Sequence, residues 1–231
     1  CTRYDVHRTT YEVHSRATLY EYIPVCTMYY VRGTMYDDVD HRTSTRYIDA
    51  RLSDAKFFWD KNKRQNLVKQ VTKLNSIVFY QKLGTLYDKT QRIRQLSSVI
   101  ADTIGANKED TEIAGSICKA DLVSDLVGEY PELQGTIGRY FALEQGFSQE
   151  ISNAIQNHYL PLGPSGKVPK EKISIAVAVA DKIDTLIGFF GIDEKPTSSK
   201  DPFALRRACL GVLRLITENK ISLSLKDILN N

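Results

Sequence analysis

Apolar residues recur at helical spacing through most of this chain, from residue 51 to residue 231. The clearest case is Leu86–Ile104, where Ile93, Leu96 and Ile100 fall on one face, with Arg92 and other charged residues outside it. Residues three and four apart share a helix face, so this spacing predicts an amphipathic helix. The segment Arg51–Leu74 carries a similar pattern and is also expected to be helical.

Capping and breaking residues divide the rest of the chain into further helices. Asn107–Asp110 form a polar start before an apolar pattern that runs from Ile113 to Val127, and Gly128 and Pro131 then end that helix. Pro131 suits the first turn of the next helix, where its missing N–H has no intrahelical partner in any case. Farther along the chain, Ser148 is expected to cap a short helix ending at His158, and 162–169 to form a loop.

The final third predicts a central helix and an outer one. Lys172–Phe190 is apolar nearly all round, as expected of a helix surrounded by others. Asp201 and Pro202 are expected to begin the last helix, either Ser199 or Asp201 capping it and Pro202 lying at its first position. Its expected inward side chains are Phe203, Leu205, Leu210, Val212, Leu213 and Leu215. The fold class is therefore mainly α, a helical bundle.

Residues 1–50 differ sharply in composition. They contain no lysine, whereas all 17 lysines lie beyond residue 55, and they hold eight of the 13 tyrosines. Tyrosine, threonine and valine favour strands, so one interpretation is a β-rich segment. The other is that some of these residues are wrongly assigned. No functional site is placed in this segment.

Charge and cysteine content set broad limits. The net charge of +3 permits a nucleic-acid partner without requiring one, because binding needs clustered cations. The most apolar segment, Ile173–Ile192, is interrupted by Asp181, Lys182 and Asp184, so no membrane span is expected, and no signal peptide is recognised. Four cysteines far apart, without a CxxC pair, favour reduced thiols in a cytoplasmic protein.

Several longer strings carry a resemblance to a known family. They are DARLSDAKFFWDKN (49–62), KLGTLYDK (82–89), CKADLVSDLVGEYPELQG (118–135), HYLP (158–161), ADKIDTLIGFFGI (180–192) and SKDPFALRRACLGVLR (199–214). In this order and spacing they resemble the β subunit of the bacterial heterotetrameric glycyl-tRNA synthetase. The similarity is expected to cover residues 50–231 and not 1–49.

The resemblance implies a role in attaching glycine to tRNA(Gly). In that family the α subunit binds glycine and ATP, with Mg, and performs catalysis, while the β subunit supplies most tRNA contacts within an α2β2 heterotetramer. The chain would then hold no cofactor of its own. Residues 82–231 would form the family's HD-like helical domain, preceded by connecting helices at 51–81. The anticodon-binding region would be absent from this chain.

An active HD phosphohydrolase is an alternative that the residues disfavour. Such an enzyme needs several histidines and an adjacent His-Asp pair to hold its metal. Residues 51–231 contain one histidine, His158, and the expected pair is replaced by a stretch containing Lys119 and Asp121. Asp181 would be the remnant distal aspartate, or simply a carboxylate paired with lysine or bonded to a helix start. His158 would be a packing or capping residue, and no metal is expected.

Phosphate loops, nucleophile elbows and Cys-His pairs are missing, so no catalytic residue is assigned to this chain. Contacts to tRNA phosphates would need lysine and arginine. The candidates are Lys82, Lys89, Arg92, Arg94, Lys167, Lys170, Lys200, Arg206 and Arg207. For each, a solvated position or a salt bridge is the alternative, and Arg207 could anchor Asp181 or Asp184. A scaffold without RNA contact is the competing function.

Overall fold

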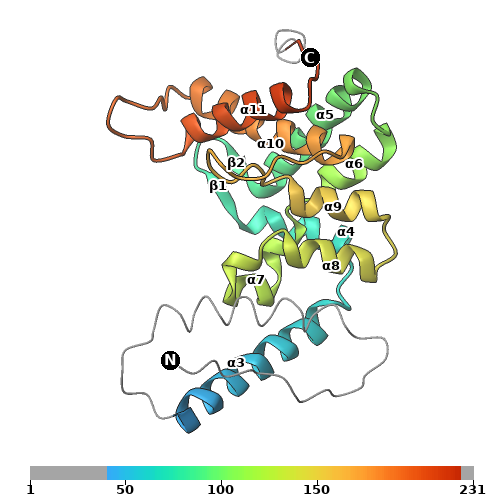
Figure 1. Cartoon of the computed structure of the whole chain (residues 1–231), viewed down its shortest axis with the longest axis vertical. Coiled ribbons are helices and arrows are strands. Elements are labelled where there is room, and N and C mark those ends of the chain that lie inside the picture. The colour runs from blue at the N-terminus through green and yellow to red at the C-terminus, as the bar shows by residue number, and fades with distance from the viewer. Residues whose placement is uncertain (1–40, 225–231) are drawn as a thin grey trace, which may run out of the picture. The chain divides into compact units, whose positions relative to one another are not determined.

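The computed structural model describes the backbone of residues 41–224 and the side chains of residues 49–224. Helices make up most of this range (Figure 1), which confirms the mainly α prediction. In chain order the elements are α3 (His41–Asn62), α4 (Leu67–Val71), η1 (Thr72–Ser76), β1 (Val78–Tyr80), β2 (Gly84–Thr85), α5 (Leu86–Ile104), α6 (Lys108–Ile117), η2 (Ala120–Val123), α7 (Asp125–Glu129), η3 (Pro131–Leu133), α8 (Thr136–Glu144), α9 (Gln149–Asn157), α10 (Lys172–Gly191) and α11 (Leu205–Glu218).

The chain divides into two compact units between Phe57 and Phe58. The described part of the first unit is the portion of α3 up to Phe57, and the second unit contains every later element. Most of the segment expected to be β-rich lies outside the described residues. Residues 41–50, however, are the first turns of α3, so that part is helical and not β. The domain limits at 50 and 81 stay predictions.

The second unit is built around α10, which packs against α5, α9 and α11. Between Ile173 and Ala180 every α10 residue is buried, and Ala176, Ala178 and Ala180 are fully so. These small side chains let neighbouring helices approach closely, and the burial confirms the predicted central position. Despite this apolar character, no helix in the described range is both long and apolar enough to cross a membrane.

The string at residues 82–89 forms a hairpin turn followed by a helix start. β1 and β2 pair antiparallel, and Gly84 takes a positive φ of 85° at the turn. Thr85 then caps α5: its hydroxyl accepts from the Asp88 N–H while the Asp88 carboxylate accepts from the Thr85 N–H. The capping box begins α5 at Leu86, and Gly105, with a φ of 65°, follows its last residue, Ile104. Both limits were predicted, whereas the hairpin was not.

The helix predicted from Asn107 to Val127 is wrong in its second half. Asn107 does cap α6, but α6 ends at Ile117, and the chain continues as η2 and the separately capped α7. Tertiary hydrogen bonds explain the break, because the carboxylate of Asp121 is used by backbone N–H groups of a later segment. Ile113, expected inside, is 38% exposed.

The last helix begins later than predicted. α11 starts at Leu205, and Pro202 lies in the turn before it. The N-cap position is Ala204 and not Asp201, but the Asp201 carboxylate accepts hydrogen bonds from the first helical N–H groups, those of Leu205 at 2.8 Å and Arg206 at 3.0 Å. The inward pattern is wrong at Leu210 and Leu213, which are 55% and 48% exposed.

Candidate functional site

Five charged side chains meet at the centre of the second unit, where α5 and the residue before η2 pack against α10. We call this group the ionic cluster; its members are Lys89, Arg92, Lys119, Asp181 and Asp184. The two basic residues of α5 are three positions apart, as are the two aspartates of α10. Each pair therefore shares a helix face, which brings opposite charges together across the α5–α10 contact.

Lys89 lies at the core of the ionic cluster and is only 3% exposed. Its Nζ is 2.9 Å from Asp184 Oδ2 and 3.1 Å from Asp181 Oδ1, and it donates to the Thr185 hydroxyl at 2.8 Å. A buried ammonium is tolerated only with such partners. Because these contacts hold the Lys89 charge inside the protein, we leave Lys89 out of the proposed RNA-binding residues.

Arg92 completes the surroundings of Asp184. Its Nε lies 2.5 Å from Asp184 Oδ1, and its Nη1 donates to the Leu83 carbonyl at 3.3 Å. Arg92 therefore forms the salt bridge that was the alternative to a phosphate contact. Lys89 and Arg92 take the anchoring role considered for Arg207, which is exposed.

Lys119 and Asp181 form the second half of the ionic cluster. The Lys119 Nζ lies 3.2 Å from Asp181 Oδ2 and 4.1 Å from the centre of the Tyr159 ring. Burial would raise the pKa of Asp181, but Lys119 and Lys89 outweigh it and hold that pKa well below its ordinary value. Asp181 is thus paired with lysine, one of the two alternatives raised by the sequence.

The remaining positions of the expected HD-like site, Asp121 and His158, are also buried. Asp121 Oδ2 accepts hydrogen bonds from the N–H groups of Gly135 at 2.6 Å and Gly138 at 3.3 Å. Burial nevertheless raises the pKa of Asp121 to about 6. His158 follows α9 as its C-terminal cap; its Nδ1 lies 2.6 Å from the Ile155 carbonyl, and burial holds its pKa well below the ordinary value.

These four positions do not make a cation site. Lys119 places a positive charge directly on Asp181, and Asp121 is committed to backbone N–H groups. Within the part of the chain that the structure describes, no three His, Cys, Asp or Glu side chains are arranged to hold a metal ion. The ionic cluster pairs each of its two carboxylates with two basic side chains.

Asp121 should make the protein more stable to unfolding as the pH falls from 7 to 5. Its folded pKa of about 6 exceeds the ordinary 3.8, so the folded state binds more protons in this range. Its contribution is complete below about pH 4 and is lost as the pH rises through about 6. Relative to Asp121→Asn, the natural chain should gain about 1 kcal/mol in unfolding free energy between pH 7 and pH 5.

Urea unfolding of both proteins at each pH measures this difference. His158 acts in the opposite direction below its ordinary pKa, because burial lowers its folded value, but it does so in both proteins. The comparison therefore isolates Asp121. Identical pH dependence in the two proteins would contradict the assignment.

Two of the basic candidates stabilise helix ends or lie near them. Lys170 donates to the Glu218 carbonyl at the end of α11, and Lys167 lies exposed in the same loop. Lys172, a neighbouring lysine, donates to the Gly105 carbonyl after α5. A cation near the C-terminus of a helix interacts favourably with the helix dipole and stabilises the helix. Lys170 and Lys172 therefore have a structural role at the C-terminal ends of α11 and α5, respectively.

Another group of basic candidates lies at the opposite end of α11, about 20 Å away by the helical rise. We call it the hairpin–loop surface: the β1–β2 hairpin, the loop 192–204 and the first turn of α11. Its exposed basic residues are Lys82, Lys200, Arg206 and Arg207. The structure thus brings four of the nine candidates together around one region.

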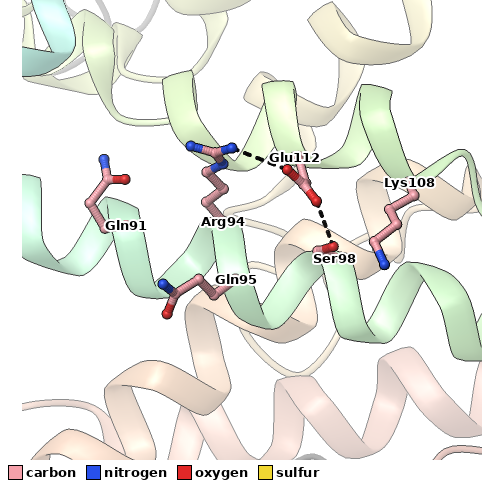
Figure 2. A pocket seen from close by; sticks show the side chains of 6 residues that line it. All are labelled: Gln91, Arg94, Gln95, Ser98, Lys108 and Glu112. Carbon is pink, nitrogen blue, oxygen red and sulfur yellow. Dashed lines mark hydrogen bonds and ion pairs between the residues drawn. The ribbon is translucent and has the colours of Figure 1, made fainter. Parts of the chain in front are cut away.

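Arg94 lies apart from both groups, in a shallow polar groove of about 460 Å³ between α5 and α6 (Figure 2). The Glu112 carboxylate forms an ion pair with Arg94 Nη2 at 3.2 Å and accepts a hydrogen bond from the Ser98 hydroxyl at 2.8 Å. The Ser98 hydrogen bond and the Arg94 guanidinium lower the pKa of Glu112. Gln91, Gln95 and Lys108 complete the lining. The Arg94 charge is thus partly used by Glu112.

Two residues that organise the core were not singled out from the sequence. Lys182 donates to the carbonyls of His158 at 3.1 Å and Leu160 at 2.7 Å, which ties the end of α9 to α10. Tyr159 carries the ring beneath Lys119. One available signal was the lysine inside the apolar α10 pattern, because a buried lysine requires oxygen partners.

The described residues thus define a mainly helical domain with a largely buried ionic cluster and a basic edge. Residues 35–231 match the family model described as glycyl-tRNA synthetase beta subunit. The chain is 51% identical over 183 residues to the glycine–tRNA ligase beta subunit of Rhodospirillum centenum (78% of this chain, 26% of that protein). It is 43% identical over 200 residues to the protein of the same name from Acinetobacter baumannii strain ATCC 17978 (84% of this chain, 29% of that protein).

The chain belongs to the glycyl-tRNA synthetase beta subunit family. It spans about a quarter of the length of these curated relatives. The family match begins at residue 35, so the expectation that residues 1–49 lie outside the similarity was wrong for residues 35–49.

Proposed function

We propose that this chain is a section of the β subunit of a heterotetrameric, α2β2 glycyl-tRNA synthetase in the cytoplasm. The whole enzyme would attach glycine to tRNA(Gly) at the expense of ATP, with ATP, Mg and the catalytic residues at the α subunit. The observation that carries this proposal is the family match over residues 35–231. The name of its relatives, glycine–tRNA ligase beta subunit, supports the same activity.

Within that enzyme we assign this section to tRNA binding. The exposed basic residues of the hairpin–loop surface support the assignment, because affinity for nucleic acid comes largely from cations that reach phosphates. We leave out Lys89 and Arg92, because their charges are paired with the buried carboxylate of Asp184. Arg94, Lys167 and Lys170 remain secondary candidates, since their positions are exposed.

A scaffold that holds subunits and domains together is the competing function. The exposed apolar residues Leu210 and Leu213 on α11 favour it, because apolar side chains on one helix face often mark a protein contact. The two functions predict different effects of charge reversal. Loss of tRNA affinity supports RNA binding, whereas loss of subunit assembly supports the scaffold.

We also propose that residues 82–231 have an HD-like fold whose hydrolytic chemistry has been lost. The ion pair between Lys119 and Asp181 supports this, because a lysine ammonium on that carboxylate opposes a bound cation. A second carboxylate, that of Asp121, already uses its Oδ2 to accept hydrogen bonds from the backbone N–H groups of Gly135 and Gly138. A metal-dependent phosphohydrolase is therefore disfavoured on physical grounds.

Glycylation assays with the full-length subunits test the proposed activity. The α and β subunits together should charge tRNA(Gly) with glycine in the presence of ATP and Mg, whereas each subunit alone should give less than about one-hundredth of that rate, a loss equivalent to about 2.7 kcal/mol. A tRNA lacking the glycine anticodon serves as the substrate control. Full activity from the α subunit alone would overturn the proposed role of β.

A further inference from the structure

An aromatic cluster holds the three parts of the hairpin–loop surface together. The Phe189 and Phe203 rings stack with centroids 4.1 Å apart. Tyr80 of the hairpin meets these rings edge-on at 5.2 and 5.3 Å, and its hydroxyl donates to Glu194 at 3.0 Å. Segments more than 100 residues apart are therefore fixed beside the long connection between α10 and α11 (Figure 1).

Exposed basic residues lie close in sequence to this aromatic cluster. Lys82 follows Tyr80 by two residues, and Arg206 and Arg207 follow Phe203 by three and four. The Arg206 guanidinium donates to the Thr197 carbonyl, and the Thr197 N–H donates to the Lys200 carbonyl at 2.9 Å. These hydrogen bonds hold the loop, and with it Lys200, beside the start of α11.

The acidic residues nearby are already engaged. Asp193 pairs with Lys195, Glu194 accepts from Tyr80, and Asp201 caps α11. Among the described residues, no ion pair is formed by the side chains of Lys82, Lys200 or Arg207. The hairpin–loop surface therefore presents a surplus of positive charge. Two of its basic residues, Arg206 and Arg207, lie in the first turn of α11, where the helix dipole disfavours a positive charge.

An exposed aromatic residue lies at the edge of the same region. Phe190 occupies the last turn of α10, next to the buried Phe189, and is 48% exposed. Phe203 and Tyr80 are half-buried, so parts of their rings also reach the surface. The Phe190 ring is therefore accessible to a stacking partner.

We propose that the hairpin–loop surface binds unpaired nucleotides of RNA, with Phe190 stacking on a base and Lys82, Lys200, Arg206 and Arg207 contacting phosphates. Bases in a duplex hide their faces, so a stacking side chain selects single-stranded loops or ends. A protein partner fits less well, because lysine is depleted at the centre of protein interfaces. This inference rests on the proposed tRNA-binding function and names the part of the tRNA that this surface contacts.

Charge reversal in the full-length β subunit, assembled with its α partner, tests the phosphate contacts. The triple variant Lys82→Glu, Lys200→Glu and Arg207→Glu should weaken tRNA(Gly) binding at least 10-fold and reduce the slope of its salt dependence by about three phosphate contacts. The matched control carries the same charge change at exposed lysines elsewhere: Lys69→Glu, Lys73→Glu and Lys220→Glu. Equal losses from both triple variants would overturn the proposed site.

Phe190→Ala tests stacking without a change in charge. It should weaken binding of a single-stranded RNA oligonucleotide by about 5-fold or more and leave the binding of a fully paired RNA duplex unchanged. Leu213→Ala is the control, because Leu213 is also 48% exposed. Equal losses for single-stranded and duplex RNA would contradict stacking on unpaired bases.

An error in the proposed tRNA-binding function and an error in the hairpin–loop site would give different results. If the natural assembly binds no tRNA, the proposed tRNA-binding function itself is wrong. If it binds tRNA normally and neither the triple variant nor Phe190→Ala reduces affinity, only the hairpin–loop site is wrong. If the variants weaken association with the α subunit and spare RNA affinity, the surface is a protein interface and the inference is overturned.

Discussion

Asp184→Ala is expected to lower the free energy of unfolding by about 3–5 kcal/mol, because it removes one partner of a buried ion pair. Asp184 is 4% exposed and forms ion pairs with both Lys89 and Arg92 across the α5–α10 contact. Without it, Lys89 keeps only Asp181 as an acidic partner, and Asp181 is shared with Lys119. Urea unfolding followed by circular dichroism measures the change.

Asp102→Ala is the matched control for Asp184→Ala. It removes the same side chain, also paired with a lysine, from a position where the aspartate is 56% exposed. Solvent screens such a pair, so little change in stability is expected. Equal effects of the two substitutions would show that burial of the ionic cluster does not control its contribution.

Phe141→Ala is expected to cost about 3–5 kcal/mol of unfolding free energy by leaving a cavity in the core. Phe141 lies on α8, is 2% exposed, and stacks on Trp59 with ring centroids 5.2 Å apart. The truncation should also change the near-ultraviolet circular dichroism of Trp59, the only tryptophan in the chain. That signal reports the local loss of packing separately from global unfolding.

Phe190→Ala provides the comparison for Phe141→Ala. The same atoms are removed from a side chain that is 48% exposed, so the stability should change by less than about 0.5 kcal/mol. A large effect at Phe190 together with a small one at Phe141 would contradict the described core. A stable Phe190→Ala protein also makes its RNA-binding result interpretable.

Local signals were enough to predict several helices with their limits. The apolar spacing of α5, the serine before α9 and the near-continuous apolar run of α10 each reflect residues within a few positions of one another. These patterns depend on caps and helix faces, which the sequence displays directly. They were confirmed to within one or two residues.

Features that depend on residues distant in the sequence could not be predicted from local signals. Nothing near Lys119 indicates that α6 must end before it, because the bonds of Asp121 to Gly135 and Gly138 form across the fold. Likewise, Lys89 resembles any surface lysine until α10 supplies its aspartates. The site was therefore predicted by residue type, while its division into buried ion pairs and an exposed basic surface required the structure.

The contact between α5 and α10 also affects the order in which the chain can fold. Lys89 and Asp184 are 95 positions apart, and closing a loop of that length costs about 4 kcal/mol in entropy. During synthesis from the N-terminus, α5 leaves the ribosome with two cations long before their carboxylates follow. Stable folding of this unit should therefore wait until α10 has emerged.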